Sequence, residues 1–265
     1  MQPSPADWGL PPGVNRGLWD YAHDPDIARA HDASLAGSSL FAADLAFAER
    51  HFDRPGRLID LGCGTGRLLV PFAQRGFWVL GVDLSEEMLR VASAKALAAG
   101  VSVHRLQANL VELDSMVDRS FDYAACLFST FGMVEGCEQR RRVVEHAYRL
   151  LRPGGKFIVH VHNRWFNFWD PQGRTWLLLD CWHSLSGDQD AGDRVMPVHQ
   201  GVAGLKLHLF TRSETTRLLT SVGFRLLETL ALGLGDDGRL PWPKFLGWLR
   251  AYGYLVAVER PLSQD

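Results

Sequence analysis

Short apolar runs alternate along residues 56–162 with longer segments in which apolar positions recur at helical spacing. A short continuous apolar run is typical of a buried strand, and the longer pattern is typical of a helix with one buried face. We expect strands at 57–61, 77–82, 101–107, 121–127 and 156–161, and helices at 66–75, 85–99 and 136–151. Strands that alternate with helices over short connections predict an α/β fold with a doubly wound, mostly parallel sheet.

The alternation stops after the fifth expected strand. Residues 163–210 carry three short β-like runs, at 176–179, 195–199 and 205–210, and turn-rich sequences separate the first two. We therefore expect a β-rich insertion after the fifth strand, covering the mouth of a pocket.

Helical patterning returns at Thr211, which forms a capping box with Glu214. This helix is expected to stop at Gly223, and two further strands are expected at 224–230 and 254–258. The predicted sheet therefore has seven strands.

Composition and charge narrow the classes of function. The 265 residues are 46% hydrophobic with a net charge of -2, so the chain lacks the basic surface that binds a nucleic-acid backbone. Its four cysteines form no C-x-x-C pair and no zinc spacing, which indicates reduced thiols in a cytoplasmic protein. No apolar run is long enough to span a bilayer, and residues 1–17 lack the apolar core of a signal peptide. We expect a cytoplasmic monomer or homodimer that binds neither nucleic acid nor membrane.

The most informative motif runs from Asp60 to Gly66 (D-L-G-C-G-T-G) after the first strand, with Asp83 at the end of the second. Glycine is needed where the backbone turns tightly and approaches a ligand without a Cβ in the way. A carboxylate that ends the next strand is placed to accept hydrogen bonds from a ribose. The dinucleotide fingerprint G-x-G-x-x-G would need a third small residue at position 67, where this chain has arginine.

In these residues the chain resembles the class I S-adenosylmethionine-dependent methyltransferases, whose first motif has this G-x-G-x-G form. The resemblance covers 56–162 strongly and 205–260 weakly, and it implies a Rossmann-like methyltransferase fold with S-adenosylmethionine as cofactor. Residues 1–50 would form an N-terminal cap or lid. Residues 51–265 would form the methyltransferase domain, with 163–210 as a substrate-side insertion. Another nucleotide-binding doubly wound protein is the alternative.

The resemblance also implies which residues meet the cofactor. The glycine-rich turn would pack against the methionine end, Asp60 would hold the amino-acid portion, and Asp83 would bind both ribose hydroxyls. Asn109 stands where the family often has an acid that touches the adenine amino group, and a turn-capping role is its alternative. The expected cofactor-binding residues are Asp60, Gly62, Cys63, Gly64, Gly66, Asp83, Leu84, Met88, Asn109, Leu110, Leu127 and Phe128.

Methyl transfer from a sulfonium depends on positioning and removal of water, because the cofactor carries the activated group. His160 and His162 end the fifth strand, at the edge where α/β sheets place ligands, and are candidates for a general base. His183 could pair with Asp180 in the insertion for the same purpose. Structural histidines and exposed lid residues are the alternatives. The H-x-H spacing lacks a third ligand, so we expect no metal site.

Candidate substrate contacts are Tyr21, Phe131, Asn163, Arg164 and Trp165. Tyr21 precedes the core, where many members of the family place a helix that closes over the cofactor. Trp165 begins an aromatic-rich stretch that either lines an apolar pocket or attaches the insertion to the domain.

The neutral charge, the single domain and the aromatic insertion favour a methyltransferase that acts on an oxygen or nitrogen of a small molecule. A protein or RNA methyltransferase would predict a basic groove or an appended recognition domain, and the sequence shows neither. Residues 129–132 also depart from the Asn/Asp-Pro-Pro-aromatic motif of many amino-methylating nucleic-acid enzymes. A non-catalytic subunit that binds S-adenosylmethionine for regulation is a further alternative. Aminopropyl transfer on a related fold is another, although the sequence shows no dense acidic substrate motif.

Overall fold

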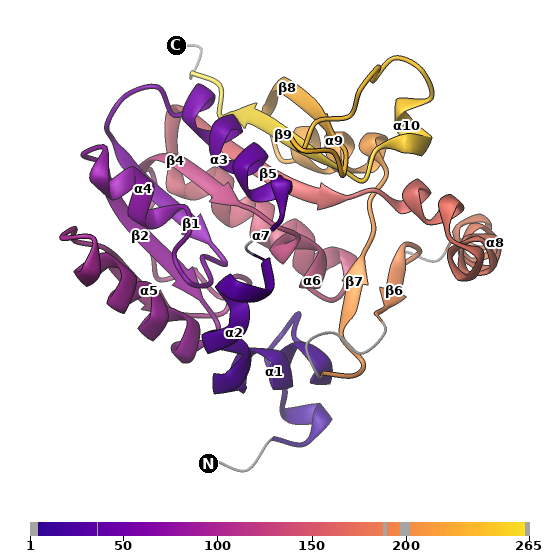
Figure 1. Ribbon diagram of the computed structural model, residues 1–265, viewed down its shortest axis with the longest axis horizontal. Coiled ribbons are helices and arrows are strands. Elements are labelled where there is room, and N and C mark those ends of the chain that lie inside the picture. Colours follow the sequence, from indigo (N-terminus) through magenta and orange to yellow (C-terminus); the bar gives the residue numbers. More distant parts are fainter. Residues whose placement is uncertain (1–4, 36, 188–189, 197–201, 263–265) are drawn as a thin grey trace.

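The computed structural model describes residues 5–35, 37–187, 190–196 and 202–262 (Figure 1). Its core is a seven-stranded sheet in the order β3-β2-β1-β4-β5-β9-β8. The strands are β1 (Arg57–Leu61), β2 (Trp78–Asp83), β3 (His104–Gln107), β4 (Phe121–Cys126), β5 (Leu151–His162), β8 (Arg225–Leu232) and β9 (Gly253–Glu259). The first five pair in parallel, and β9 runs antiparallel between β5 and β8. The predicted seven-stranded, mostly parallel sheet is confirmed.

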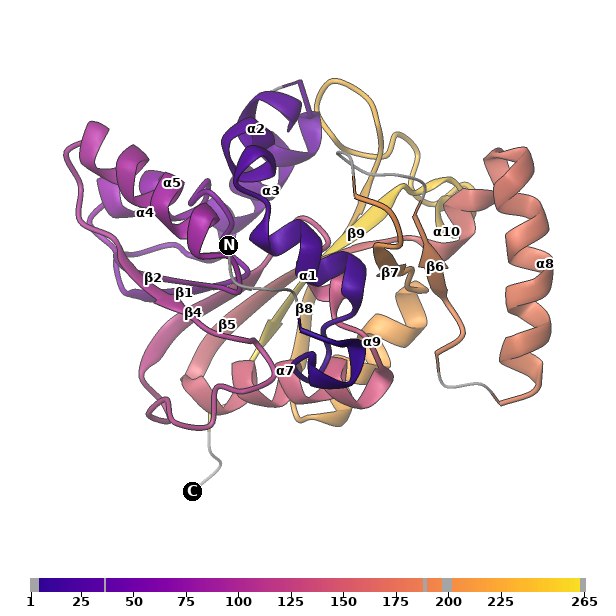
Figure 2. The ribbon, with the colours of Figure 1, turned by 90° about the horizontal axis from the view of Figure 1, so that it is seen from below.

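Helices cover both faces of this sheet, as Figure 2 shows. One face is covered by α3 (Ser39–His51), α4 (Leu69–Gln74) and α5 (Glu86–Ala98), and the other by α7 (Cys137–Leu150) and α9 (Arg212–Ser221). Side chains alternate along a strand, so adjacent residues of β1 enter different cores. Leu58 belongs to the cluster of Phe47 and Phe72, whereas Ile59 belongs to the cluster of Val143.

The predicted helix starts agree with the side-chain hydrogen bonds. The Ser85 hydroxyl accepts a hydrogen bond from the Met88 N–H at 3.2 Å and caps α5. Thr211 and Glu214 form the predicted capping box of α9, with N–H to oxygen distances of 3.1 and 3.2 Å. Local polar residues therefore fix where these two helices begin.

The first half of the insertion contradicts the expectation of a β-rich segment. Residues 176–179, expected as a strand, lie inside helix α8 (Pro171–Leu185), which follows the 3-10 helix η2 (Arg164–Trp169). Asp170 caps α8 by accepting a hydrogen bond from the Gly173 N–H at 2.7 Å, and proline occupies the first helical position. The polar cap and the proline indicate a helix start, and they precede the apolar run that suggested a strand.

The second half of the insertion contains a two-stranded antiparallel hairpin, β6 (Asp193–Val195) with β7 (Lys206–His208). Strand β7 lies within the expected run at 205–210, whereas β6 shares only Val195 with the expected run at 195–199. Residues 197–199 of the first run lie outside the described residues.

In the described residues before the sheet, the 3-10 helix η1 (Asp7–Gly9) and the α-helices α1 (Arg16–His23) and α2 (Pro25–Leu35) precede α3. Asp32 of α2 accepts a hydrogen bond from the Thr65 hydroxyl at 2.5 Å and one from the Lys95 ammonium at 2.6 Å. These contacts join α2 both to the loop after β1 and to α5. The N-terminal helices are thereby held at the carboxyl ends of the parallel strands.

Candidate functional site

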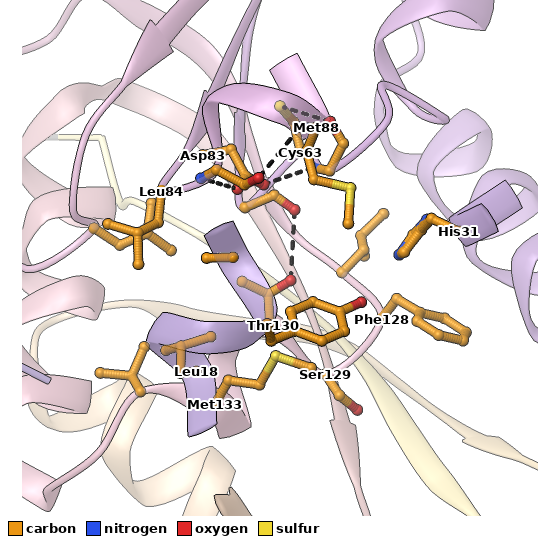
Figure 3. A pocket seen from close by; sticks show the side chains of 18 of the residues that line it. Leu18, His31, Cys63, Asp83, Leu84, Met88, Phe128, Ser129, Thr130 and Met133 are labelled. Carbon is orange, nitrogen blue, oxygen red and sulfur yellow. Dashed lines mark hydrogen bonds between the residues drawn. The ribbon is translucent and has the colours of Figure 1, made fainter. Parts of the chain in front are cut away.

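A cavity of about 500 Å³ lies at the carboxyl ends of the parallel strands, against the N-terminal helices (Figure 3). This volume falls within the range of about 300–1000 Å³ that is typical of small-ligand sites. Asp83 and Met88 lie on one side of the cavity, and Thr130 and Met133 on the opposite side. Open α/β sheets bind ligands at this edge, so the cavity is the candidate functional site.

The structure brings together eleven of the twelve residues expected at a cofactor site. Those that line the cavity are Asp60, Gly62, Cys63, Gly64, Asp83, Leu84, Met88, Asn109, Leu110, Leu127 and Phe128. Gly66 does not line it, which corrects that expectation. A Cβ at Gly66 would lie 3.0 Å from the Cβ of Ala92, so this glycine allows the loop to pack closely on α5.

The loop after β1 turns sharply at Gly62 and Gly64, whose φ angles are 79° and 50°. This left-handed region favours glycine. A Cβ at Gly62 would lie 2.1 Å from Cγ2 of Thr130, in the short helix α6 (Thr130–Met133) that follows β4. The Gly62 N–H donates to the Val82 carbonyl at 2.7 Å. The glycine motif thus brings the loops after β1 and β4 into contact beside the cavity.

Asp83 is fixed in orientation by two backbone hydrogen bonds. Its Oδ2 accepts from the Gly64 N–H at 2.7 Å, and its Oδ1 accepts from the Ser85 N–H at 2.9 Å. Burial raises the pKa of this carboxyl group, and the backbone donors only partly offset that rise. Each oxygen retains a lone pair, so the carboxylate can still accept hydrogen bonds from ligand hydroxyls.

Asp60 is the most strongly perturbed acid of the cavity. It is 3% exposed, and burial together with the charge of Asp83 raises the pKa of Asp60 to about 7. The group is therefore partly protonated near neutral pH. A cationic ligand group beside it would favour the charged carboxylate.

Arg67 is a cavity residue that the sequence analysis did not select. Its guanidinium lies 3.2 Å from the ring centroid of Phe41 and 5.1 Å from that of Phe128. Burial lowers the pKa of Arg67 to about 10, which leaves it cationic. Its Nη1 is buried without a hydrogen-bond partner in the described structure, so it can donate to an anionic ligand group. The sequence feature that indicates Arg67 as a site residue is its position directly after the third glycine of the motif.

The backbone after β4 is strained where it borders the cavity. Phe128 and Ser129 have φ angles of 50° and 66°, a region that non-glycine residues seldom occupy. Such strain often marks a ligand site. The sequence gives no signal for it, because neither residue is a type that favours a left-handed conformation.

Asn109 combines both roles that the sequence left open. It lines the cavity, and its Oδ1 accepts a hydrogen bond from the Val111 N–H at 3.2 Å, as a turn-capping residue does. Its Nδ2 donates to the Pro12 carbonyl at 2.9 Å. The side chain therefore holds the N-terminal segment beside the cavity, and one Oδ1 lone pair remains for a ligand.

The two histidines of β5 lie in different environments. His160 is fully buried, and its Nδ1 lies 2.8 Å from Oδ1 of Asp44 on α3. It does not line the cavity, so the expectation that it acts as a general base is corrected. Its contact fastens α3 to the sheet.

His162 does line the cavity, with its ring centroid 5.6 Å from that of His160. Burial, followed by the effect of His160, lowers the pKa of His162 to about 3, so the ring is neutral at pH 7. Its Nδ1 is enclosed without a hydrogen-bond partner among the described residues. The ring therefore retains an unpartnered nitrogen that can form a hydrogen bond with a ligand.

Tyr21 lines the cavity, whereas the other four substrate candidates do not. Phe131 is fully buried and stacks on Phe210 with ring centroids 5.2 Å apart. The Asn163 Nδ2 donates to the carbonyls of Trp248 and Ala251 at 2.7 and 2.8 Å. Core packing and loop anchoring, rather than substrate contact, explain these two positions.

Arg164, Trp165 and His183 also lie away from the cavity, which corrects their assignment to the site. Arg164 forms a buried ion pair with Asp180. Trp165 packs edge-to-face against Trp248 with centroids 5.6 Å apart. His183 is exposed on α8. The Trp165 ring thus attaches the insertion to the domain, whereas Phe168 and Trp169 of the same stretch are exposed.

The cavity also contains residues from the N-terminal helices and the β4 loop that the sequence did not indicate. They include His31, Phe41, Asp44, Thr130 and Met133. Among the described residues, no cluster of three His, Cys, Asp or Glu side chains could hold a metal ion. The described helices include none that is both long and apolar enough to cross a membrane.

Comparison with protein families gives a match at residues 58–155, to the family described as methyltransferase domain. A segment of 130 residues is 33% identical to the ubiquinone biosynthesis O-methyltransferase of Idiomarina loihiensis. It covers 47% of this chain and 51% of that protein. The chain spans about half the length of the curated relatives it matches.

Two solved structures share the fold. A SAM-dependent methyltransferase of Methanosarcina mazei has a TM-score of 0.65 at 21% identity, over 82% of this chain and 98% of that one. The 1,6-didemethyltoxoflavin-N1-methyltransferase of Burkholderia thailandensis has a TM-score of 0.62 at 18% identity, over 89% and 84%. The latter was solved with 1,6-didemethyltoxoflavin and S-adenosylhomocysteine bound.

Proposed function

Because the chain belongs to the class I S-adenosylmethionine-dependent methyltransferase family, we propose that it methylates an oxygen or nitrogen of a small molecule. The main support for the proposal is that the glycine turn, Asp60 and Asp83 all line one cavity at the carboxyl edge of the sheet. Family membership supports the reaction, and the chemistry of the cavity supports the substrate class.

The residues of the cavity fit S-adenosylmethionine. The Asp83 oxygens suit the ribose hydroxyls, and the apolar side chains of Leu84 and Met88 suit the adenine. Asp60 suits the ammonium group and the unpartnered Nη1 of Arg67 suits the carboxylate. When bound, the cofactor would supply an electrophilic methyl group on a sulfonium.

The rest of the cavity supports a largely apolar substrate. Its wall includes side chains from the N-terminal segment, the β4 loop and the insertion, namely Val14, Leu18, Met133, Val134, Met196, Leu205 and Leu207. An apolar wall stabilises a ring-bearing or aliphatic molecule by burial and disfavours a charged one. One relative is named as an O-methyltransferase and one structural neighbour as an N-methyltransferase, which supports either nucleophile.

His162 is proposed to orient the nucleophile. Its neutral ring can accept a hydrogen bond from a hydroxyl or amine and receive the proton as the new bond to carbon forms. With a pKa of about 3, the imidazole of His162 is a weak base until the bond to carbon begins to form. Its main contribution to the reaction is therefore to orient the nucleophile.

His162→Ala should therefore lower kcat by about 10- to 100-fold while the dissociation constant for S-adenosylhomocysteine changes less than about threefold. Steady-state kinetics and calorimetry measure the two quantities. His183→Ala is the matched control, because this histidine is exposed on α8 outside the cavity, and it should retain full activity. An unchanged kcat in His162→Ala would assign the ring to structure alone.

Residues 1–50 are proposed to act as a cap over the bound ligands, with 51–265 as the methyltransferase domain. Leu18, Tyr21 and His31 of the N-terminal helices contribute to the cavity wall, which supports this role. From the 163–210 insertion, Leu205 and Leu207 contribute the substrate-side wall, whereas α8 does not contribute.

The proposal is tested by incubating the protein with methyl-labelled S-adenosylmethionine and a host extract, then separating the products by size. Label in the small-molecule fraction is expected. Asp83→Ala is the control, because losing the fixed carboxylate should abolish labelling and weaken cofactor binding. Label in protein or RNA would overturn the substrate class. Intact cofactor binding with no labelled product in any fraction would favour a non-catalytic regulatory subunit.

A further inference from the structure

Helix α8 has two apolar faces, and the described structure covers one of them. Its inner face is buried by η2 and the hairpin, at Gly173, Leu177 and Asp180. Its outer face is 62 to 85% exposed and consists of Leu178, Leu179, Trp182 and Leu185. Positions 178, 182 and 185 follow the spacing of a single helical stripe. A stripe of this kind normally packs against another element.

Exposed apolar side chains also occur on two further segments, which Figures 1 and 2 both draw at the same end of the molecule as α8. The first is η2, and the second is the loop that leads into α10 (Gly247–Arg250). Trp169 Nε1 of η2 donates to the Leu249 carbonyl of α10 at 3.0 Å, so the two segments are in contact. We call the α8 surface the set Phe168, Trp169, Leu178, Leu179, Trp182, Leu185, Trp242, Phe245, Leu246 and Trp248, all at least 45% exposed.

The α8 surface is larger than a monomer normally exposes. Exposed aromatic and leucine side chains of this kind each present on the order of 100 Å², which gives roughly 1000 Å² for the ten residues. The largest apolar patch of a typical monomer is about 300–600 Å², and a stable interface buries about 800 Å² on each partner. Two copies of this surface would therefore suffice for a stable dimer.

We propose that the α8 surface is a homodimer interface in which α8 packs antiparallel against α8 of a second copy. Antiparallel pairing about a two-fold axis near Trp182 places Leu178 of one copy opposite Leu185 of the other. The stripe is therefore complementary to itself, as an isologous interface requires. This inference is independent of the proposed methyl transfer.

Charge favours a second copy over a membrane as the occupant. A helix that binds a membrane surface is usually rich in Lys and Arg on its polar face. Within α8, the permanently cationic side chain is Arg174, and the carboxylate of Asp180 is paired internally with Arg164. Lys244 and Arg250 add two cations at the α10 end of the surface. The α8 stripe at positions 178, 182 and 185 carries no charged side chain, so an identical stripe can approach it without charge repulsion.

Sedimentation and light scattering of the full chain should give about twice the mass of 29.6 kDa at micromolar concentration. Leu178→Glu combined with Trp182→Glu places four like charges at the two-fold contact and should give a monomer. Leu97→Glu is the matched control, because Leu97 is a leucine 82% exposed on α5, far along the chain from α8, and this variant should remain dimeric. Circular dichroism and S-adenosylhomocysteine affinity establish that each variant is folded.

Hydrogen exchange of the unmodified protein gives a second readout that does not depend on any variant. Amides of α8 and of residues 241–250 should become more protected as the concentration rises through the dimer dissociation constant. The proposal is overturned by a monomeric protein at all concentrations, or by a folded double variant that stays dimeric. A monomer that cosediments with phosphatidylcholine–phosphatidylglycerol vesicles would also overturn it and assign the surface to membranes.

Discussion

At the scale of single residues, the ionisation of Asp60 is the property most directly linked to ligand binding. Burial and the neighbouring charge of Asp83 raise the pKa of Asp60 to about 7. A ligand ammonium beside this carboxyl group would lower its pKa, so the group should lose its proton on binding. Affinity should then rise with pH up to about 7 and level off above it.

This loss of a proton can be measured by calorimetry. Binding of S-adenosylhomocysteine at pH 6.5 should release roughly three quarters of a proton, so the apparent enthalpy should change with the ionisation enthalpy of the buffer. Asp60→Asn should remove that dependence. 5′-Methylthioadenosine, which lacks the ammonium, should show none in either protein. Equal enthalpies for S-adenosylhomocysteine in phosphate and Tris would contradict the prediction.

Arg67 should distinguish ligands by their carboxylate. Arg67→Met retains much of the apolar contact with Phe41 but removes the donor, and a hydrogen bond between charged groups contributes about 1.5–3 kcal/mol. The variant should bind S-adenosylhomocysteine about 10- to 100-fold more weakly and 5′-methylthioadenosine within about threefold of the original affinity. A parallel loss for both ligands would show that Arg67 acts on the shape of the cavity instead.

At the scale of elements, the glycine turn depends on a close approach as well as on backbone conformation. Gly62→Ala places a methyl group 2.1 Å from Cγ2 of Thr130, whereas the space around Gly76 is open. Both glycines have a positive φ, so Gly76→Ala measures the conformational cost alone, about 1–2 kcal/mol. Gly62→Ala should destabilise the protein by more than that in urea unfolding and weaken cofactor binding. Equal losses in the two variants would show that α6 can move away freely.

The elements that were predicted correctly are those with local signals. Polar caps at Ser85 and Thr211 mark helix starts, and β4 is a short run that is apolar except for Asp122. The run at 176–179 is helical although its apolar residues predict a strand, because a short apolar segment does not distinguish a strand from a helix that is apolar on two faces. Its helical signal lies upstream, at Asp170.

The residues of the site likewise divide into those that a local sequence pattern predicts and those that depend on tertiary packing. Asp60 is the penultimate residue of β1 and Asp83 is the last residue of β2, so pairing within the sheet determines where they lie. Phe41 and Asp44 reach the cavity only because α3 packs back over the sheet, which no local pattern encodes. Arg67 was visible in the motif, but its role depends on that same α3 contact.

At the scale of the whole molecule, a buried polar network joins the insertion to the domain. His208 of β7 is hydrogen-bonded through Nδ1 to Asp193 of β6 at 2.5 Å and through Nε2 to Glu214 of α9 at 2.7 Å. Buried Arg140 of α7 lies 3.4 Å from the same Asp193 carboxylate. Because both ring nitrogens face carboxylates, the protonated imidazolium satisfies the network best. The hairpin that lines the substrate side of the cavity is therefore attached through a titratable group.

Stability should consequently depend on the ionisation of His208. Burial lowers the pKa of His208, but hydrogen bonds to Asp193 and Glu214 outweigh burial and raise it above the ordinary value. A raised histidine pKa stabilises the fold fully below the unfolded pKa of about 6.5, and this contribution is lost as pH rises through the folded pKa.

The thermal midpoint should fall between pH 6 and pH 9, and His208→Gln should have a lower midpoint at pH 6 with a smaller fall. Comparing the two proteins at each pH cancels the contribution of Asp60, which also titrates in this range. Parallel pH profiles would show that the network is held by Arg140 rather than by the charge on His208.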